Sequence, residues 1–243
     1  TKCDNATGLP WSMHDGFGQY HGQHDANCGG LMVKTATTLA RAYYLTQNES
    51  YAAGAASVLR TWFLDASTAM RLNLNYGAFV PGVENGSCYG IIATSFDWNS
   101  EVTDALVLLE GSRHWSAADA AGMRRWNARY LDWLIGSPLG LKEFNQSNNH
   151  FTWLMVEALA LAWSTGNATV AHKLVARARS ADYRGCLQNQ ISADGLMTHE
   201  ASREGGATYS VMNLRGLFSL ATLAAHSSNA DDLWTWRETS SGR

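Results

Sequence analysis

The chain has 243 residues, of which 46% are hydrophobic, 16% charged and 11% aromatic, and its formal net charge is −3. This composition excludes a disordered or collagen-like protein, and the length suits one globular domain over residues 1–243. The basic residues form no run that would bind nucleic acid, and the apolar stretches fall short of the roughly 20 residues that a membrane span needs.

The first predicted loop covers residues 1–30 and is rich in His. Its H-x-x-H spacing resembles a metal-binding pattern, but no Glu base on a helix accompanies it, so we expect no metal. Cys28 of the same loop is better explained as a disulfide partner in an oxidising compartment. The residues of this weak metal pattern are His14, His21, His24 and Cys28.

The cysteines and glycosylation sequons predict a secreted glycoprotein. No C-x-x-C pair is present, and two disulfides could form in any of three connectivities. The alternative is buried free thiols with sequons that arise by chance. The disulfide candidates are Cys3, Cys28, Cys88 and Cys186, and the sequons lie at Asn5, Asn48, Asn85, Asn145 and Asn167.

Two similar phrases predict repeated helical hairpins. Residues 39–59 (LARAYYLTQNESYAAGAASVL) resemble residues 158–178 (ALALAWSTGNATVAHKLVARA), and each has an Asn in its polar turn, where Asn is favoured by the backbone. Such repeats are typical of an α-solenoid or a closed α/α toroid, so we predict an all-α fold of antiparallel helical hairpins.

A long helix is predicted between these two phrases. The apolar residues Met123, Trp126, Tyr130, Trp133 and Leu134 follow helical spacing, Ser116 to Asp119 resemble a capping box, and Gly136-Ser-Pro138 ends the pattern.

Long loops over residues 1–30, 65–97 and 186–208 should meet at one end of a helical array and form a cleft. Within the second loop, Asn73, Asn75 and Tyr76 combine amide and aromatic side chains that suit a sugar ring. Turn chemistry explains these residues equally well.

The segment 145–153 precedes an apolar helix, so Asn148 or Asn149 is the expected N-cap and His150 falls in the first turn. A carboxylate bound there would meet backbone amides, a carboxamide and an imidazole. The alternative is a simple cap followed by a packing His.

Arg203 and Tyr209 flank a Gly-Gly turn before the last predicted helix. A nearby guanidinium would favour the phenolate that a tyrosine base requires. The alternative is a core Tyr with a surface Arg. A further alternative is a glycoside hydrolase that uses two carboxylates, with Glu143, Glu157, Asp194, Glu200 and Glu204 available.

Several motifs in this order resemble the alginate lyase domain. They are AYYLTQNESYA (42–52), LRTWFLD (59–65), NLNYGAFVPG (73–82), GII (90–92), YLDWLIGSPLG (130–140), NNHFTW (148–153), YSVMNL (209–214) and DLWTW (232–236). The resemblance implies an incomplete α/α toroid with a cleft and a polysaccharide lyase that cleaves a 1,4-linked polyuronate without a cofactor or metal.

The resemblance also implies roles for individual residues. Asn149, His150 and Arg203 would neutralise the substrate carboxylate, and Tyr209 would remove the C5 proton and return it to the leaving oxygen, with His150 as an alternative base. The expected substrate-binding residues are Asn148, Trp153, Asn73, Asn75 and Tyr76. The partner would be an acidic polysaccharide, either alginate rich in mannuronate or glucuronan.

Departures from the family pattern keep a second function open. Thr208 stands directly before Tyr209, where the family usually has a His or another aromatic residue. A basic lid segment near the N-terminus has no counterpart, and the chain stops at Arg243, where a further helix pair is expected. The alternative is therefore a catalytically silent extracellular protein that binds a polysaccharide matrix. The sequons favour a eukaryotic, secreted branch of the family.

Overall fold

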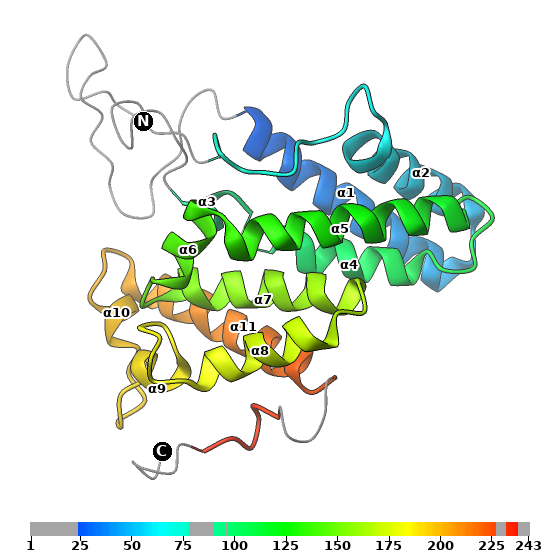
Figure 1. Ribbon diagram of the computed structural model, residues 1–243. Coiled ribbons are helices and arrows are strands. Elements are labelled where there is room, and N and C mark those ends of the chain that lie inside the picture. Colours follow the sequence, from blue (N-terminus) through cyan, green and yellow to red (C-terminus); the bar gives the residue numbers. More distant parts are fainter. Residues whose placement is uncertain (1–23, 78–89, 96, 227–231, 238–243) are drawn as a thin grey trace.

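The computed structural model describes residues 24–77, 90–95, 97–226 and 232–237, and within these ranges it contains helices and loops but no strand (Figure 1). The helices are α1 (His24–Thr46), α2 (Glu49–Leu59), the π-helical η1 (Arg60–Leu64), α3 (Ile92–Ser95), α4 (Trp98–Leu108), α5 (Ala117–Gly136), α6 (Pro138–Phe144), α7 (Asn149–Ser164), α8 (Ala168–Arg179), α9 (Leu187–Gln190), α10 (Thr198–Ala201) and α11 (Gly206–Ala224).

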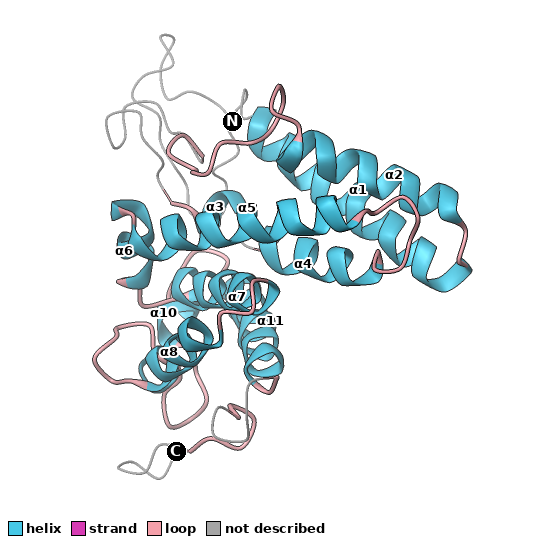
Figure 2. Cartoon of the chain, turned by 45° about the vertical axis from the view of Figure 1, so that its right-hand side comes forward, coloured by secondary structure: helices cyan, strands magenta, loops and turns pink. Residues whose placement is uncertain are grey.

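The long helices form two layers of an incomplete α/α toroid. Helices α1, α4, α7 and α11 pack side by side in that order as the inner layer. Helix α2 covers α1, while α5 and α8 cover α7 (Figure 2). The predicted hairpins are confirmed as α1–α2 and α7–α8, and Asn48 and Asn167 of their turns cap α2 and α8. The all-α prediction is therefore correct.

Helix α7 is the centre of the core. It contacts α3, α4, α5, α6, α8 and α11, and nearly all of its residues from Asn149 to Ala162 are buried. Gly216 lets α11 approach α7 closely, because a Cβ atom there would lie 2.9 Å from Thr152 of α7. A side chain at position 216 would therefore push α11 away from α7.

The sequence pattern of α5 is confirmed in detail. The Ser116 hydroxyl accepts the N–H of Asp119, and the Asp119 carboxylate accepts the N–H of Ser116, which completes the capping box. The predicted apolar face is buried at Met123, Trp126, Tyr130 and Leu134. The helix ends at Gly136, and Ser137 then caps a short helix, α6, that the sequence pattern did not predict.

Several helices lie in segments that were predicted as loops. Helix α1 begins at His24, although the loop was expected to extend to Gly30, and the segment 186–208 contains the short helices α9 and α10. Helix α11 begins at Gly206 because Gly205 takes a left-handed conformation with φ of 75° and turns the chain into the helix.

The described parts of the loops before α4, α7 and α11 lie at one end of the layers, as the alternation of inner and outer helices requires. Residues 1–23 and 78–89 of the predicted loops lie outside the described residues. Each inner helix begins where a loop returns from an outer helix, so the segments before α4, α7 and α11 share one end. Figure 1 shows α3, α6, α9 and α10 together at this end, beside the start of α7. We refer to it as the loop end.

An ion pair ties α5 to η1. Arg60 donates to both carboxylate oxygens of Asp119 at 2.9 and 2.6 Å, and this contact lowers the pKa of Asp119. Because the folded-state pKa is lowered, the stabilisation is full above the ordinary Asp value near ~4 and is lost as the pH falls through the folded-state value.

We expect Asp119→Asn to lower the free energy of unfolding by about 1 kcal/mol at pH 7, which corresponds to roughly 2–4 °C in Tm. The difference from wild type should shrink as the pH is lowered below about 4. Thermal unfolding followed by circular dichroism measures both effects. Asp132→Asn, on an exposed position of the same helix, is the control and should change little.

Glu157 lies in the middle of α7 with no exposed surface, and its Oε2 accepts a hydrogen bond from Asn99 of α4 at 3.0 Å. Burial raises the pKa of Glu157 well above its ordinary value, which favours the neutral acid. The unfolded chain releases this proton more readily. Stability is therefore lost as the pH rises from the unfolded-state value near ~4.3 towards the folded-state value.

We expect Glu157→Gln to remove this loss, because the amide is neutral at every pH and keeps an oxygen for Asn99. Relative to wild type, the variant should gain up to about 1.4 kcal/mol for each pH unit between the two pKa values. Urea unfolding at pH 4 to 8 measures the slope. Parallel pH dependences of the two proteins would contradict a raised pKa.

Candidate functional site

The first turn of α7 lies at the loop end. Asn148 is the N-cap, and its side-chain oxygen accepts the N–H of His150 at 3.2 Å. This settles the choice between Asn148 and Asn149 that the sequence left open. Asn149 is then the first helical residue, and its backbone N–H has no acceptor within the helix.

Glu200 of α10 fills the anion position at this helix start. Its Oε1 accepts the backbone N–H of Asn149 at 2.5 Å and the Asn149 side-chain amide at 2.8 Å. The sequence placed a substrate carboxylate here, and the structure instead places a carboxylate of the protein itself. The reason is the chain path, since α10 brings Glu200 against the positive end of α7.

The other oxygen of Glu200 binds Arg203, with Nη1 of Arg203 at 3.0 Å from Oε2. The guanidinium then lies over Tyr209, with its Cζ atom 3.3 Å from the ring centre. A cation this close to an aromatic face interacts with it favourably. The tight turn at Gly205 and Gly206 returns the chain so that Arg203 faces Tyr209, and a Cβ at position 206 would lie 2.6 Å from the carbonyl oxygen of Ala201.

His150 has its own buried carboxylate partner. Its Nδ1 lies 2.9 Å from Oε2 of Glu143, whose side chain is only 3% exposed. A carboxylate can only accept, so Nδ1 carries the proton and Nε2 is the nitrogen left for another partner. Gly90 packs against this pair, because a Cβ there would lie 3.0 Å from Oε1 of Glu143 and 3.4 Å from the imidazole ring.

The four predicted catalytic residues therefore lie in two linked groups. Glu200 connects Asn149 to Arg203 and Tyr209, and the chain itself connects Asn149 to His150. The side chains of His150 and Arg203 are 22% and 18% exposed, and Tyr209 is half-buried. Asn149 is 1% exposed, so it lies directly behind the accessible groups.

The other predicted substrate-binding residues have different surroundings. Trp153 is 1% exposed and packs in the core, with the guanidinium of Arg215 5.2 Å from its ring centre. In the second loop, the Asn73 side chain accepts the N–H of Asn75, as a turn residue does. Tyr76 is 75% exposed. The structure thus supports the turn interpretation for Asn73 and leaves the Tyr76 ring open to a ligand.

The carboxylates considered for a hydrolase do not form an open pair at the loop end. Glu143, Glu157 and Glu200 are buried and bound to protein donors, whereas Asp194 and Glu204 are exposed. A hydrolase needs two carboxyl groups on either side of the bound sugar. Within the described ranges, no cluster of three or more His, Cys, Asp or Glu side chains could hold a metal ion.

The cysteines differ from the expected disulfides. Cys28 is exposed on α1 and Cys186 is buried at the N-cap of α9, and both are free thiols. Burial raises the pKa of Cys186, which favours the thiol over the thiolate. Cys3 and Cys88 lie outside the described residues, as do His14 and His21.

Three of the five predicted sequons lie on the surface of the described structure. Asn48, Asn145 and Asn167 are exposed. Asn5 and Asn85 lie outside the described residues.

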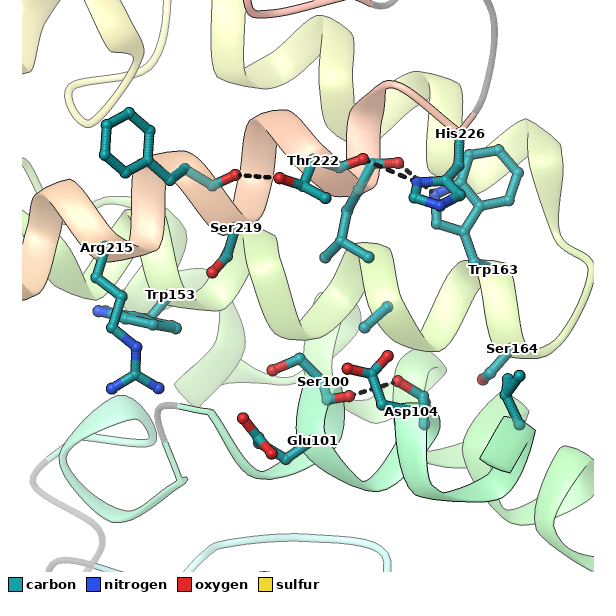
Figure 3. Close-up of a pocket in the computed structure, with 15 residues that line it drawn as sticks. Ser100, Glu101, Asp104, Trp153, Trp163, Ser164, Arg215, Ser219, Thr222 and His226 are labelled. Atoms are coloured by element: carbon teal, nitrogen blue, oxygen red, sulfur yellow. Dashed lines mark hydrogen bonds between the residues drawn. The ribbon is translucent and has the colours of Figure 1, made fainter. Parts of the chain in front are cut away.

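A groove of about 770 Å³ runs along the inner face between α4, α7 and α11 (Figure 3). Arg215 and Trp153 lie at one end of it, and Trp163 and His226 lie at the other. Arg215 is paired with Asp97 at 2.7 Å, and the wall formed by α4 carries Glu101 and Asp104. These acidic groups do not favour an acidic polymer in the groove.

Sequence reasoning placed Glu143 and Glu200 only among the carboxylates of a hydrolase. Glu200 stands three residues before Arg203, a spacing typical of a helical ion pair, and this was the one local signal. Its bonds to Asn149 span 51 residues, and sequence spacing does not reveal such a contact.

Comparison with known proteins gives one family. A sequence model of the alginate lyase family matches residues 1–243. The structure is similar to the crystal structure of an alginate lyase from Bacteroides ovatus, with a TM-score of 0.87 and 30% sequence identity over 97% of this chain. The chain spans 61% of the length of that protein. No curated protein matches the chain.

We expect the neutral ring of His150 to carry its proton on Nδ1, because Glu143 accepts it there. Long-range ¹H–¹⁵N correlation spectra of the histidine side chains report this tautomer. Glu143→Ala should remove the preference of His150 for this tautomer. The signals of His226, whose Nδ1 faces the Thr222 carbonyl oxygen at 2.8 Å, should be unchanged and serve as an internal control. A proton on Nε2 of neutral His150 in the wild type would contradict the assignment.

Proposed function

Because the chain belongs to the alginate lyase family, we propose that it is a polysaccharide lyase that cleaves a 1,4-linked polyuronate by β-elimination. The observation that carries the proposal is the position of Arg203 over the Tyr209 ring, with Glu200 linking Arg203 to Asn149 beside His150. A cation, a phenol and an imidazole on neighbouring elements match the needs of this reaction.

The reaction removes the proton at C5 of the uronate, which is acidic only when the adjacent carboxylate is neutralised. The C5–H electrons form a double bond to C4, and the C4–O bond breaks towards the leaving oxygen, which takes up a proton. The enzyme must therefore stabilise negative charge that develops on the carboxylate and supply one group that accepts and one that donates a proton.

Arg203 and His150 are the accessible groups suited to the carboxylate. Arg203 carries several N–H donors, and its Nη1 donates to Glu200. The Asn149 amide stands behind them and has a second hydrogen besides the one given to Glu200. Tyr209, directly beneath Arg203, is proposed as the base at C5 and as the acid towards the leaving oxygen.

The proposed substrate is alginate rich in mannuronate, or glucuronan, and the proposed binding face is the loop end. The exposed ring of Tyr76 is proposed as a platform for a sugar ring. The carboxylates of the chain support a lyase over a hydrolase. A hydrolase needs two carboxyl groups beside the sugar, and the buried carboxylates Glu143, Glu157 and Glu200 are bound to protein donors instead. No helix of the described ranges has the length and apolar character to cross a membrane. Secretion and glycosylation stay predictions, supported by the exposed sequons.

We expect wild type to release an unsaturated uronate, which absorbs ultraviolet light because its new double bond is conjugated with the carboxylate. Polymannuronate, polyguluronate and glucuronan are assayed in parallel to identify the substrate. Tyr209→Phe should lower kcat by about 10²- to 10⁴-fold, since it removes the group that transfers the proton. Its thermal stability should stay close to wild type.

The matched control is Tyr44→Phe, which removes the same hydroxyl from an exposed ring near the far end of α1. This variant should be as active as wild type. Silence of the wild type on all three polymers, with polymer binding retained, would instead support the matrix-binding protein.

A further inference from the structure

Glu200 binds two of the proposed catalytic residues although it is completely buried. It has no exposed surface, so it does not touch a substrate directly. Its two oxygens accept from Asn149 at the start of α7 and from Arg203 in the turn before α11. A buried carboxylate with this set of donors is well satisfied and strongly fixed in place.

The neighbouring chain makes this arrangement rigid. The N–H of Arg203 donates to the carbonyl oxygen of Glu200 at 3.0 Å, and the N–H of Gly206 donates to that of Arg203 at 2.9 Å. A side chain at position 206 would collide with the carbonyl oxygens of Glu200 and Ala201. The backbone of Arg203 is therefore held in place, and the hydrogen bond to Glu200 helps to fix the position of its guanidinium.

We propose that Glu200 is a positioning residue for the β-elimination, which holds the Arg203 guanidinium over Tyr209 and in register with Asn149 and His150. This inference rests on the proposed function. In this role, Glu200 sets the distance between the groups that neutralise the substrate carboxylate and the group that removes the C5 proton. Loss of this anchor would weaken the hold on the guanidinium over the Tyr209 ring.

The orientation matters most in the transition state. Charge moves onto the substrate carboxylate as the C5 proton leaves, and donors fixed in advance stabilise that charge without reorganising. A mobile Arg203 would still attract the polymer, since its charge remains. Loss of the anchor should therefore affect kcat more than KM.

Glu200→Gln is the sharpest variant because the side chain keeps its size. If the amide oxygen faces Asn149, the amide nitrogen meets Nη1 of Arg203, and two donors oppose each other. If the amide is reversed, its nitrogen meets both donors of Asn149. Either orientation breaks part of the anchor while the volume of the buried site is kept.

Glu204→Gln is the matched control. It makes the same change in charge one residue after Arg203, at an exposed position. We expect Glu204→Gln to have wild-type kcat. We expect Glu200→Gln to lower kcat by about 10- to 100-fold, as loss of a supporting partner typically does, with a smaller change in KM.

A double-mutant cycle separates positioning from a purely structural role. If Glu200 acts through Arg203, Glu200→Gln should lower kcat much less in an Arg203→Ala background than in the wild type, because the group that it positions is absent. Glu200→Asp keeps the charge with a shorter reach and should restore part of kcat. This variant also serves if Glu200→Gln fails to fold, which circular dichroism reveals.

The outcomes are distinct when product is followed by ultraviolet absorbance on the polymer that wild type cleaves. Wild-type kcat in Glu200→Gln would overturn the positioning role alone, as would equal fold-losses from this substitution with and without Arg203. A wild-type enzyme that cleaves no polyuronate would overturn the proposed function and, with it, the reaction that Glu200 is inferred to serve.

Discussion

The burial of α7 is the constraint on which the rest of the structure depends. Helices pack around it on several sides, and it is apolar along nearly its whole length, so its position leaves little freedom for its neighbours. The first turn of α7 is therefore fixed at the loop end, where the backbone N–H of Asn149 has no acceptor within the helix. Glu200 satisfies that donor, and this contact in turn fixes the segment that carries Arg203 and Tyr209.

Three buried carboxylates around α7 have different roles. Glu200 and Glu143 accept hydrogen bonds from site residues and hold them in place, whereas Glu157 lies in the middle of the helix, where burial favours its neutral form. Residue type alone does not distinguish these roles. They follow from what faces each group: a helix start and a guanidinium, an imidazole, or a carboxamide of the next inner helix.

The sequence predicted the parts of the fold that depend on local pattern. Capping by Ser116 and Asp119, the apolar face of α5 and the polar turns at Asn48 and Asn167 all follow from spacing within a few residues. The resemblance named Asn149, His150, Arg203 and Tyr209, and the structure brings Arg203 to Tyr209. The roles of Glu143 and Glu200 were not predicted, because burial and tertiary contacts determine them.

The place where an acidic polymer can bind follows from the charges of the inner groove and of the loop end. The inner groove presents Glu101 and Asp104, and its cation Arg215 is paired with Asp97. At the loop end, Arg203 lies over the Tyr209 ring, and its carboxylate partner Glu200 is enclosed by protein. With a net charge of −3, the chain attracts a polyanion only through local positive potential. The polymer should therefore cross the loop end, where the starts of α7 and α11 meet, and should avoid the groove between the inner helices.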